Sequence, residues 1–213
     1  MWVVKLGGSL LGTPELAHWL ALVAKFGDGK VIIVPGGGLF ADAVRDAQKI
    51  SNMDDALAHE LALLAMDQFG ILLARTNPEL VTASSELEIA ERGWQHRGVV
   101  WLPSKMVLAD ETVPKNWQVT SDSLSAWLAN KLGAEQLLLV KSKSLLGYQA
   151  EKPNSAQSLI DDELIDGQFS VFISQKKIGE DYQTYVLNKA DYSIFEQGFS
   201  VQKLAVHGLR ITA

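Results

Sequence analysis

A short glycine-rich turn between an apolar run and an amphipathic helix is the stretch of this chain best suited to binding chemistry. Residues 31–34 are β-branched and apolar, Pro35 ends the run, and Gly36, Gly37 and Gly38 follow. A turn without Cβ atoms lets a charged ligand approach the backbone N–H groups, and the next helix points its positive N-terminus at the same place. We therefore expect an anion site here, where a β-carbon at Gly37 would crowd the anion or block a positive φ angle.

The N-terminus repeats this arrangement. Apolar residues 2–4 lead to Lys5 near the end of the strand, and Gly7, Gly8 and Ser9 follow. One glycine turn alone could be no more than a tight connection. Two such turns suggest two phosphate groups, with Lys5 supplying a cation.

Composition limits the class of protein. A chain of 213 residues with 47% hydrophobic content is long enough for one sizeable core, so one domain is expected. The net charge of -6 argues against a nucleic-acid binder, and the absence of cysteine with only four scattered histidines makes zinc chemistry improbable. We expect no metal site built by the protein alone, no membrane span, a cytoplasmic location and a small partner molecule.

The elements that must position these turns follow from periodicity. Thr13 is the expected N-cap of a first helix that starts at Pro14, and the strands on either side complete a right-handed βαβ unit. Such units place ligand sites beyond the carboxyl ends of their strands, which is where both glycine turns lie. In the helix after Gly38, the charges of Asp42 and Arg45 are interpreted as a solvated face.

A long helical tract covers residues 54–75, and Leu57, Leu61 and Leu64 mark its expected buried side. His59 and Asp67 lie on this tract. A lone histidine is more often a satisfied core or surface residue than a ligand.

A second informative stretch is residues 114–140, in which Thr120 or Ser121 caps a helix and residues 137–140 return as a strand. Asp122 lies in the first turn of this helix. Its simplest role is to complement the helix dipole, worth about 0.3–1 kcal/mol. A sharper interpretation is a carboxylate that positions lysines or a metal ion.

Three ordered motifs resemble the amino-acid kinase superfamily, which includes acetylglutamate, uridylate, aspartate and isopentenyl phosphate kinases. They are Lys5-Leu-Gly-Gly-Ser9, Pro35-Gly-Gly-Gly38, and Ser121-Asp122 followed by Leu132-Gly-Ala-Glu-Gln-Leu-Leu-Leu139. Two finer signatures are similar to a narrower branch, the aminomethylfuran phosphate kinase of methanofuran biosynthesis and its methylotroph relatives: His59-Glu-Leu-Ala-Leu-Leu-Ala-Met-Asp-Gln68 and Trp117-Gln-Val-Thr-Ser-Asp-Ser123. Ala205-Val-His-Gly208 resembles the family's last strand and glycine turn, so the resemblance covers nearly the whole chain.

The resemblance implies an α/β fold, a three-layer αβα sandwich around a mainly parallel sheet. It forms one domain over residues 1–213, with an acceptor-binding part over about 1–118 and a nucleotide-binding part over about 119–213. It also implies a homo-oligomer and phosphoryl transfer from ATP and Mg²⁺ to a carboxylate or phosphate group of a small anionic metabolite. By analogy with the family, Lys5 and Asp122 are the catalytic residues, the Gly7-Gly8 turn holds the ATP phosphates, and Gly36, Gly37 and Gly38 hold the anionic end of the acceptor. Ser9, Lys141 and Ser142 are further candidates for ATP binding, and His59, Asp67 and Ser121 are further candidates for acceptor binding.

The chain also departs from the family pattern. Lys141-Ser142 stands where relatives usually have Thr-Asp, which indicates a remodelled nucleotide side. A second catalytic lysine has no clear counterpart, and Lys176, Lys177 and Lys141 are candidates. Residues 143–184 are the least regular stretch, so we expect a mobile flap over the nucleotide.

Two other classes stay open. A Rossmann dinucleotide binder requires Gly-x-Gly-x-x-Gly spacing and an acidic residue at the end of the second strand, and neither is present. A non-catalytic anion-binding or nucleotide-binding protein on the same fold is the second alternative.

Overall fold

A single eight-stranded sheet forms the middle layer of the computed structural model, which describes residues 1–148, 153–175 and 182–212. The strand order is β3-β4-β2-β1-β5-β7-β8-β6, and each pair is parallel except β7 with β8. The strands are β1 (Trp2–Leu6), β2 (Val31–Pro35), β3 (Leu80–Ala83), β4 (Gly98–Trp101), β5 (Gln136–Lys141), β6 (Asn154–Ser155), β7 (Gln183–Asn188) and β8 (Leu209–Thr212). This order differs from the 3-2-1-4-5-6 order of the Rossmann fold.

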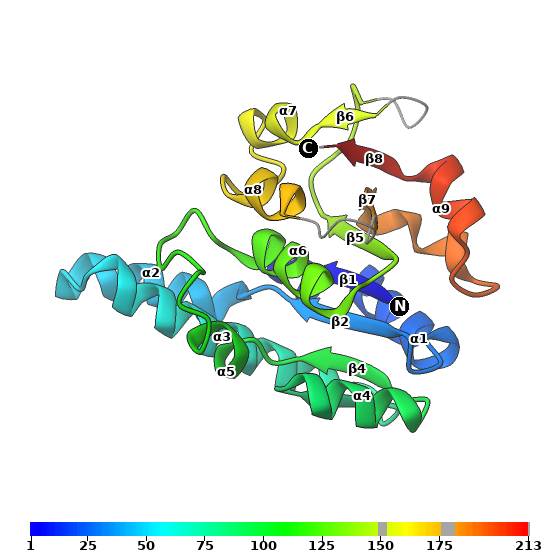
Figure 1. Cartoon of the computed structure of the whole chain (residues 1–213), viewed down its shortest axis with the longest axis horizontal. Helices are drawn as coiled ribbons and strands as arrows, with labels where there is room; N and C mark the ends of the chain where they lie inside the picture. The colour runs from blue at the N-terminus through cyan, green and yellow to red at the C-terminus, as the bar shows by residue number, and fades with distance from the viewer. Residues whose placement is uncertain (149–152, 176–181, 213) are drawn as a thin grey trace.

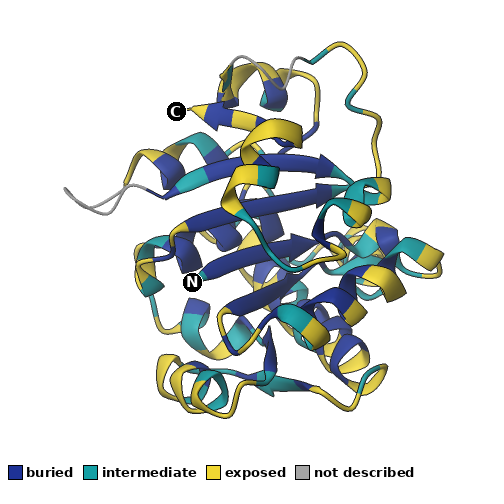
Figure 2. Ribbon diagram, turned by 90° about the vertical axis from the view of Figure 1, so that its right-hand side faces the viewer, coloured by how far each residue is buried: buried dark blue, intermediate teal, exposed yellow. Residues whose placement is uncertain are grey.

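Helices cover both faces of the sheet. They are α1 (Pro14–Phe26), α2 (Gly38–Ser51), α3 (Asp55–Arg75), α4 (Glu86–Trp94), α5 (Ser104–Leu108), α6 (Ser121–Leu132), α7 (Ala156–Asp161), α8 (Phe169–Ser174) and α9 (Val201–His207), with the 3-10 helices η1 (Gly8–Leu10) and η2 (Lys189–Phe195). Figure 1 shows α6 crossing in front of the central strands, and Figure 2 shows the strands buried between outer layers whose surfaces are exposed. The predicted three-layer αβα architecture is confirmed.

The central strand β1 is buried along its whole length, as expected for a parallel sheet covered on both faces. Val4 packs into the core on the side of α1, whereas Val3 packs into the core on the side of α6. Because successive side chains of a strand point to opposite faces, Lys5 projects to the same face as Val3. The alternation of the strand thus directs the one charged side chain of β1 toward α6.

The expected start of the first helix is correct. Thr13 is the N-cap of α1 and Pro14 is its first residue, although the Thr13 hydroxyl donates to the Leu10 carbonyl rather than capping the helix. The acceptor and nucleotide parts proposed from the family share one continuous sheet, with β1 to β4 in the first part and β5 to β8 in the second.

The tract over residues 54–75 is a helix, but its expected buried side is wrong. Asp54 caps α3 by accepting from the Leu57 N–H group, and Leu57 and Leu64 are 47% and 42% exposed. The buried face instead carries Leu63, Met66, Phe69 and Leu73. The helix is apolar around most of its circumference, so its periodicity fits two faces and cannot choose between them.

By length and composition, α3 could also cross a membrane. In its most apolar 18-residue window, however, 44% of the residues are buried inside the fold, and the core helix of a globular domain passes the same test.

Two further expectations need correction. The stretch expected to be the least regular contains helices α7 and α8, which bury Leu159, Phe169 and Phe172 in the core that α6 shares. Residues 149–152 and 176–181 of that stretch lie outside the described residues. The segment resembling a last strand and turn ends helix α9, and β8 starts only after Gly208.

Candidate active site

The carboxyl ends of three neighbouring strands meet at one point of the sheet edge. Strand β1 pairs in parallel with β2 on one side and with β5 on the other, so the turns that follow these strands lie together. The chain leaves β1 toward β2 and later returns to the other side of β1 as β5. Such a switch point is where open α/β sheets bind ligands.

The two glycine turns pack directly against each other. A β-carbon on Gly8 would lie 2.1 Å from the Gly38 nitrogen, and one on Gly36 would lie 2.4 Å from the Gly8 nitrogen. Gly38 also has a φ of +55°. Only glycine permits this backbone contact, which brings the turns after β1 and β2 together.

Gly37 does not need the positive φ angle that was one of the two expected reasons for a glycine there. Its φ is -83°, so no positive angle is required. A β-carbon there would lie 2.3 Å from the Cβ of Ala41. Gly37 is needed for packing within the first turn of α2.

A pocket of about 480 Å³ opens over both turns. Of the residues predicted from the sequence, it is lined by Gly8, Ser9, Gly36, Gly37, Gly38, His59 and Ser121. The two turns therefore contribute to one shared cavity. Gly7 does not line it and lies instead beside the ammonium group of Lys5.

His59 lines this pocket and has a buried ring nitrogen without a hydrogen-bond partner among the described residues. The residue is buried, its Nδ1 lies 3.3 Å from the Asn116 carbonyl oxygen, and its Nε2 has no hydrogen-bond partner among the described residues. Burial lowers the pKa of His59, and the nearby Lys115 lowers it further against the opposing effect of the Asn116 carbonyl. His59 is therefore a neutral group available for a ligand.

Asp122 lies between two lysines at the start of α6. Its Oδ1 is 2.8 Å from Lys5 Nζ and its Oδ2 is 2.6 Å from Lys141 Nζ. All three side chains are largely buried, with 6%, 7% and 12% of Asp122, Lys5 and Lys141 exposed. The structure thus joins the two predicted catalytic residues to Lys141, one of the candidates for a second lysine.

The electrostatics of this cluster are those of a tightly coupled buried group. Burial alone would raise the pKa of Asp122, but the ammonium groups of Lys141 and Lys5 hold it at about 2. Burial lowers the pKa of Lys141 to about 8, with Asp122 opposing this change and Lys5 adding to it. Two cations and one anion leave one excess positive charge next to the glycine turns.

A second pocket begins at Ser142, the residue after Lys141. It measures about 530 Å³ and is lined by Ser142, Ser144, Leu145, Leu146, Gly147, Tyr148, Asn188, Asp191, His207 and Leu209. The hydroxyl of Ser9, which lines the first pocket, lies 2.9 Å from that of Ser142, which lines the second. This serine pair is where the two cavities approach each other.

Two pocket residues were not predicted as such. Asp42 and Arg45 line the first pocket, and their side chains are 63% and 46% exposed, so the expected solvated face of α2 also borders the pocket. The Arg45 guanidinium lies 4.7 Å above the ring of Trp117 and 2.6 Å from Asp42, and Trp117 donates to Gln48. The charged residues of α2 are visible in the sequence, but their contact with Trp117 depends on the tertiary structure.

Asp67 is not brought to the pocket. Its carboxylate accepts from the backbone N–H and the hydroxyl of Ser104, at the first residue of α5. Burial raises the pKa of Asp67, and these two hydrogen bonds oppose the effect. In this structure Asp67 anchors the start of a helix.

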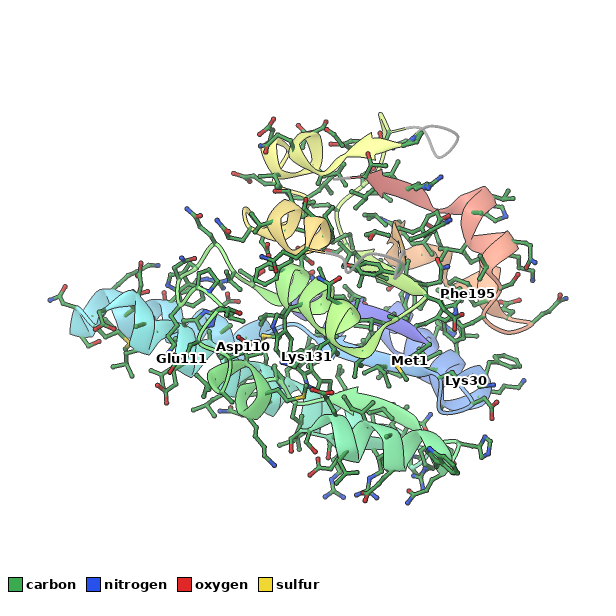
Figure 3. All side chains as sticks on the ribbon, in the orientation of Figure 1. Met1, Lys30, Asp110, Glu111, Lys131 and Phe195 are labelled. Carbon is green, nitrogen blue, oxygen red and sulfur yellow. The ribbon has the colours of Figure 1, made fainter. Side chains whose placement is uncertain are left out.

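The helix that carries Asp122 is fixed at both ends. At its N-terminus Asp166, which the sequence did not single out, accepts from Thr120 and Ser123. Toward its C-terminus Asp110 accepts from Trp127 at 3.1 Å and from Lys131 at 3.5 Å, and Figure 3 shows Asp110 and Lys131 side by side. This bracing sets the position of Asp122 relative to the sheet.

The part of the chain that the structure describes holds no cluster of three or more His, Asp, Glu or Cys side chains that could bind a metal ion. Both oxygens of Asp122 already face lysines. A magnesium ion would thus depend mainly on phosphate oxygens and water, which is its usual coordination with nucleotides. The candidates Lys176 and Lys177 lie outside the described residues.

Comparisons with known proteins agree with the resemblance to the amino-acid kinase superfamily found in the sequence. Residues 1–93 match the sequence model of the amino acid kinase family. Uridylate kinase from Archaeoglobus fulgidus has the same fold, with a TM-score of 0.66 and 17% identity over 99% of both chains. UMP kinase from Ureaplasma parvum superimposes with a TM-score of 0.67 and 14% identity over 100% of this chain and 98% of that chain. The resemblance to the amino acid kinase family is therefore confirmed, in sequence over residues 1–93 and in fold over the whole chain.

A more similar sequence is the (5-(aminomethyl)furan-3-yl)methyl phosphate kinase of Methanocaldococcus jannaschii, which is 33% identical over 141 residues. The match spans 65% of this chain and 64% of that relative. This relative belongs to the narrower branch that the two finer signatures indicated.

Proposed function

We propose that this chain is an ATP-dependent kinase that transfers a phosphoryl group to the phosphate of a small anionic acceptor, an aminomethylfuran phosphate, and forms its diphosphate. The observation that carries the proposal is the Lys5–Asp122–Lys141 cluster beside two interlocked glycine turns. The named activity of the relative at 33% identity supports the choice of acceptor.

Phosphoryl transfer needs mainly positioning and neutralisation of the charge on the moving group. Lys5 and Lys141 supply two ammonium groups next to the glycine turns, and Asp122 holds both in place. The N–H groups of the turns add donors from the N-terminus of α2. Because these ammonium and N–H groups are held in place before the reaction starts, they need little reorganisation as charge develops on the phosphoryl group.

We assign the acceptor to the first pocket. The free Nε2 of His59 and the N–H groups of Gly36 to Gly38 suit an anionic end, and His59 gains a proton more easily beside a phosphate. Trp117 offers a flat aromatic surface, with apolar Leu63 and Met66 opposite polar groups on α2. This combination fits a small ring that carries a phosphate better than it fits a purely polar metabolite.

We assign ATP to the second pocket and to the serine pair that separates the cavities. Ser142 lines that pocket and its hydroxyl reaches Ser9 in the turn after β1, so the phosphate chain would run along this contact toward Lys5. Mg²⁺ would be held by the nucleotide phosphates and water, and it would neutralise charge on them. The close approach of the pockets at one point fits direct transfer between two bound substrates.

The test is an assay of product formation with a panel of acceptors. ATP, Mg²⁺ and the purified chain are incubated with an aminomethylfuran phosphate, with UMP, or with an N-acylated glutamate, and products are identified by ³¹P NMR. We expect the signals of a furan diphosphate, distinct from those of ADP, and we expect no phosphorylated product from UMP or the N-acylated glutamate. Turnover of UMP or of the carboxylate instead would overturn the acceptor assignment.

The same assay addresses the non-catalytic alternative. A binding protein on this fold would take up ATP or acceptor in calorimetry but give no product with any member of the panel. The buried Lys5–Asp122–Lys141 cluster argues for catalysis, because taking three charges out of water is costly for a protein that only binds.

We further propose that the chain forms a homo-oligomer through α3. Leu57, Leu64 and Ile71 recur every seven residues along this helix and are 47%, 42% and 46% exposed. Such an apolar stripe on a long helix fits a matching stripe on a second copy. Leu64→Glu should yield monomers by light scattering, whereas Val206→Glu, at a residue of α9 that is 68% exposed, should not. A native protein that is monomeric at assay concentration would contradict the proposal.

A further inference from the structure

Asp166 is a charged residue next to the active centre that the proposed chemistry does not use directly. It lies in the connection between α7 and α8, and its carboxylate reaches the first turn of α6. Oδ2 accepts from the Thr120 N–H at 3.0 Å, the Thr120 hydroxyl at 2.8 Å and the Ser123 N–H at 2.9 Å. The Ser123 hydroxyl donates to Oδ1.

These contacts replace the usual cap of the helix. Thr120 is the N-cap residue of α6, but its side chain makes no capping bond to the helix. The N–H groups of a first helical turn need an acceptor, and here it comes from 43 residues further along the chain. Asp122 lies between the two residues that Asp166 holds, so the clamp fixes the backbone on both sides of the catalytic carboxylate.

The charge of Asp166 also matters for the lysines. Lys5 from β1, Lys141 from β5 and Asp122 from α6 form the charge cluster, and Asp166 from the α7–α8 connection interacts electrostatically with Asp122 and Lys141. Burial raises the pKa of Asp166, and the charge of Asp122 raises it further, while its hydrogen bonds to Ser123 and Thr120 oppose both. Asp166 in turn favours the protonated form of Lys141.

We propose that Asp166 is a positioning residue, whose carboxylate clamps the first turn of α6 and thereby holds Asp122 between Lys5 and Lys141. The expected effects on kcat and KM rest on the proposed kinase function. The expected dependence of the Lys141 titration on Asp166 does not require the chain to turn over substrate.

The first experiment compares kcat and KM in matched variants. Asp166→Asn and Ser123→Ala should lower kcat about tenfold or more and change KM for ATP and acceptor by less than threefold, since geometry matters most in the transition state. Asp166→Glu should recover part of the loss. Asn130→Ala is the control, because it removes the 2.7 Å contact from Asn130 to the Phe172 carbonyl between α6 and α8 without touching the clamp.

The second measurement does not depend on activity. Lysine ammonium groups are labelled by reductive ¹³C-methylation, and the Lys141 signal is followed by NMR during a pH titration. Asp166→Asn should move its midpoint to lower pH, because a neighbouring negative charge is lost. Ser123→Ala keeps that charge but loosens the clamp, so it should also move the midpoint to lower pH as Asp122 is no longer held against Lys141.

The outcomes separate the inference from the kinase assignment. Absence of turnover in the native protein together with a shifted Lys141 midpoint in both Asp166→Asn and Ser123→Ala would refute the kinase but support the clamp. An unshifted midpoint overturns the inference, as does a kcat loss in Asp166→Asn no larger than in Asn130→Ala. If Asp166→Asn fails to fold, Ser123→Ala and Asp166→Glu decide the kinetic part.

Discussion

The ammonium nitrogen of Lys141, at the carboxyl end of β5, lies 2.6 Å from Oδ2 of Asp122 at the start of α6. A residue that looked like a departure from the family pattern thus belongs to the buried cluster that faces the glycine turns. Its pKa of about 8 means that a modest rise in pH removes one of the two cations of the site.

Activity should therefore fall on the alkaline side. We expect kcat/KM for ATP to decrease as pH rises through about 8, because this ratio reports the ionisation of the free enzyme. Lys141→Arg keeps its charge above this range and should move the decline to higher pH, although with reduced turnover because its fork is planar and larger. A native profile that stays flat to pH 9.5 would mean that Lys141 plays no part in the chemistry.

Lys5→Met should abolish phosphoryl transfer with a small effect on folding. The change removes the second cation, and losing one pre-positioned charge of this kind lowers kcat by about 10²-fold or more. Methionine fills most of the volume of the buried side chain, and Asp122 keeps Lys141 as a partner. Lys30→Met, at an exposed lysine, is the control. Near-normal kcat in Lys5→Met would exclude the residue from catalysis.

Gly8→Ala should damage both substrate sites together. A β-carbon there would lie 2.1 Å from the Gly38 nitrogen, so the two turns must separate. We expect a lower melting temperature and weaker binding of both ATP and acceptor in calorimetry. Gly167→Ala is a matched control, because its new β-carbon would meet only Gln118 Cβ at 3.9 Å. Gly8→Ala with native affinities would show that the contact between the turns is dispensable.

His59→Ala should act on one substrate alone. If Nε2 bonds the acceptor phosphate, its loss should raise the acceptor KM about ten- to hundredfold, the range for a hydrogen bond to a charged group, and leave that for ATP nearly unchanged. His96→Ala, at an exposed histidine far along the chain, serves as the control. Equal effects on both substrates would place His59 in the general packing of the pocket.

The sequence could predict those features that depend on local pattern. The apolar runs of β1, β2 and β5 are short and buried, and parallel strands necessarily bring their glycine turns to one edge. Periodicity could not predict which face of a helix is covered by another element of the fold. It placed Leu57 and Leu64 of α3 in the core, whereas both are exposed, and it did not show that the solvated Arg45 of α2 borders a pocket.

The pairing of Lys5 with Asp122 could be expected only through the family resemblance, since more than a hundred residues separate them. Asp166 had no sequence signal at all. Its role depends on α7 and α8 packing against α6, in a stretch whose composition suggested an irregular flap. Capping by a distant residue leaves no motif next to the helix that it caps.

Asp122→Asn distinguishes an active kinase from a non-catalytic protein with the same fold. The buried geometry changes what is expected of its stability: with the carboxylate gone, Lys5 and Lys141 face each other without a counter-charge. Breaking a buried ion pair from one side costs about 3–5 kcal/mol, well above the effect of a lost helix-dipole interaction. The variant should therefore melt at a markedly lower temperature, and kcat should drop about 10²-fold or more because both cations lose their position.

Acid unfolding provides the check on the charge itself. The pKa of Asp122 is lowered from 3.8 to about 2 in the folded state, so its contribution to stability is present above pH 3.8 and is lost as pH falls through about 2. The native protein should lose this part of its unfolding free energy between these values, and Asp122→Asn should not. The double variant Asp122→Asn with Lys141→Gln has one fewer unpaired charge and should regain stability without regaining kcat. A single Asn variant with native kcat would remove Asp122 from the catalytic centre.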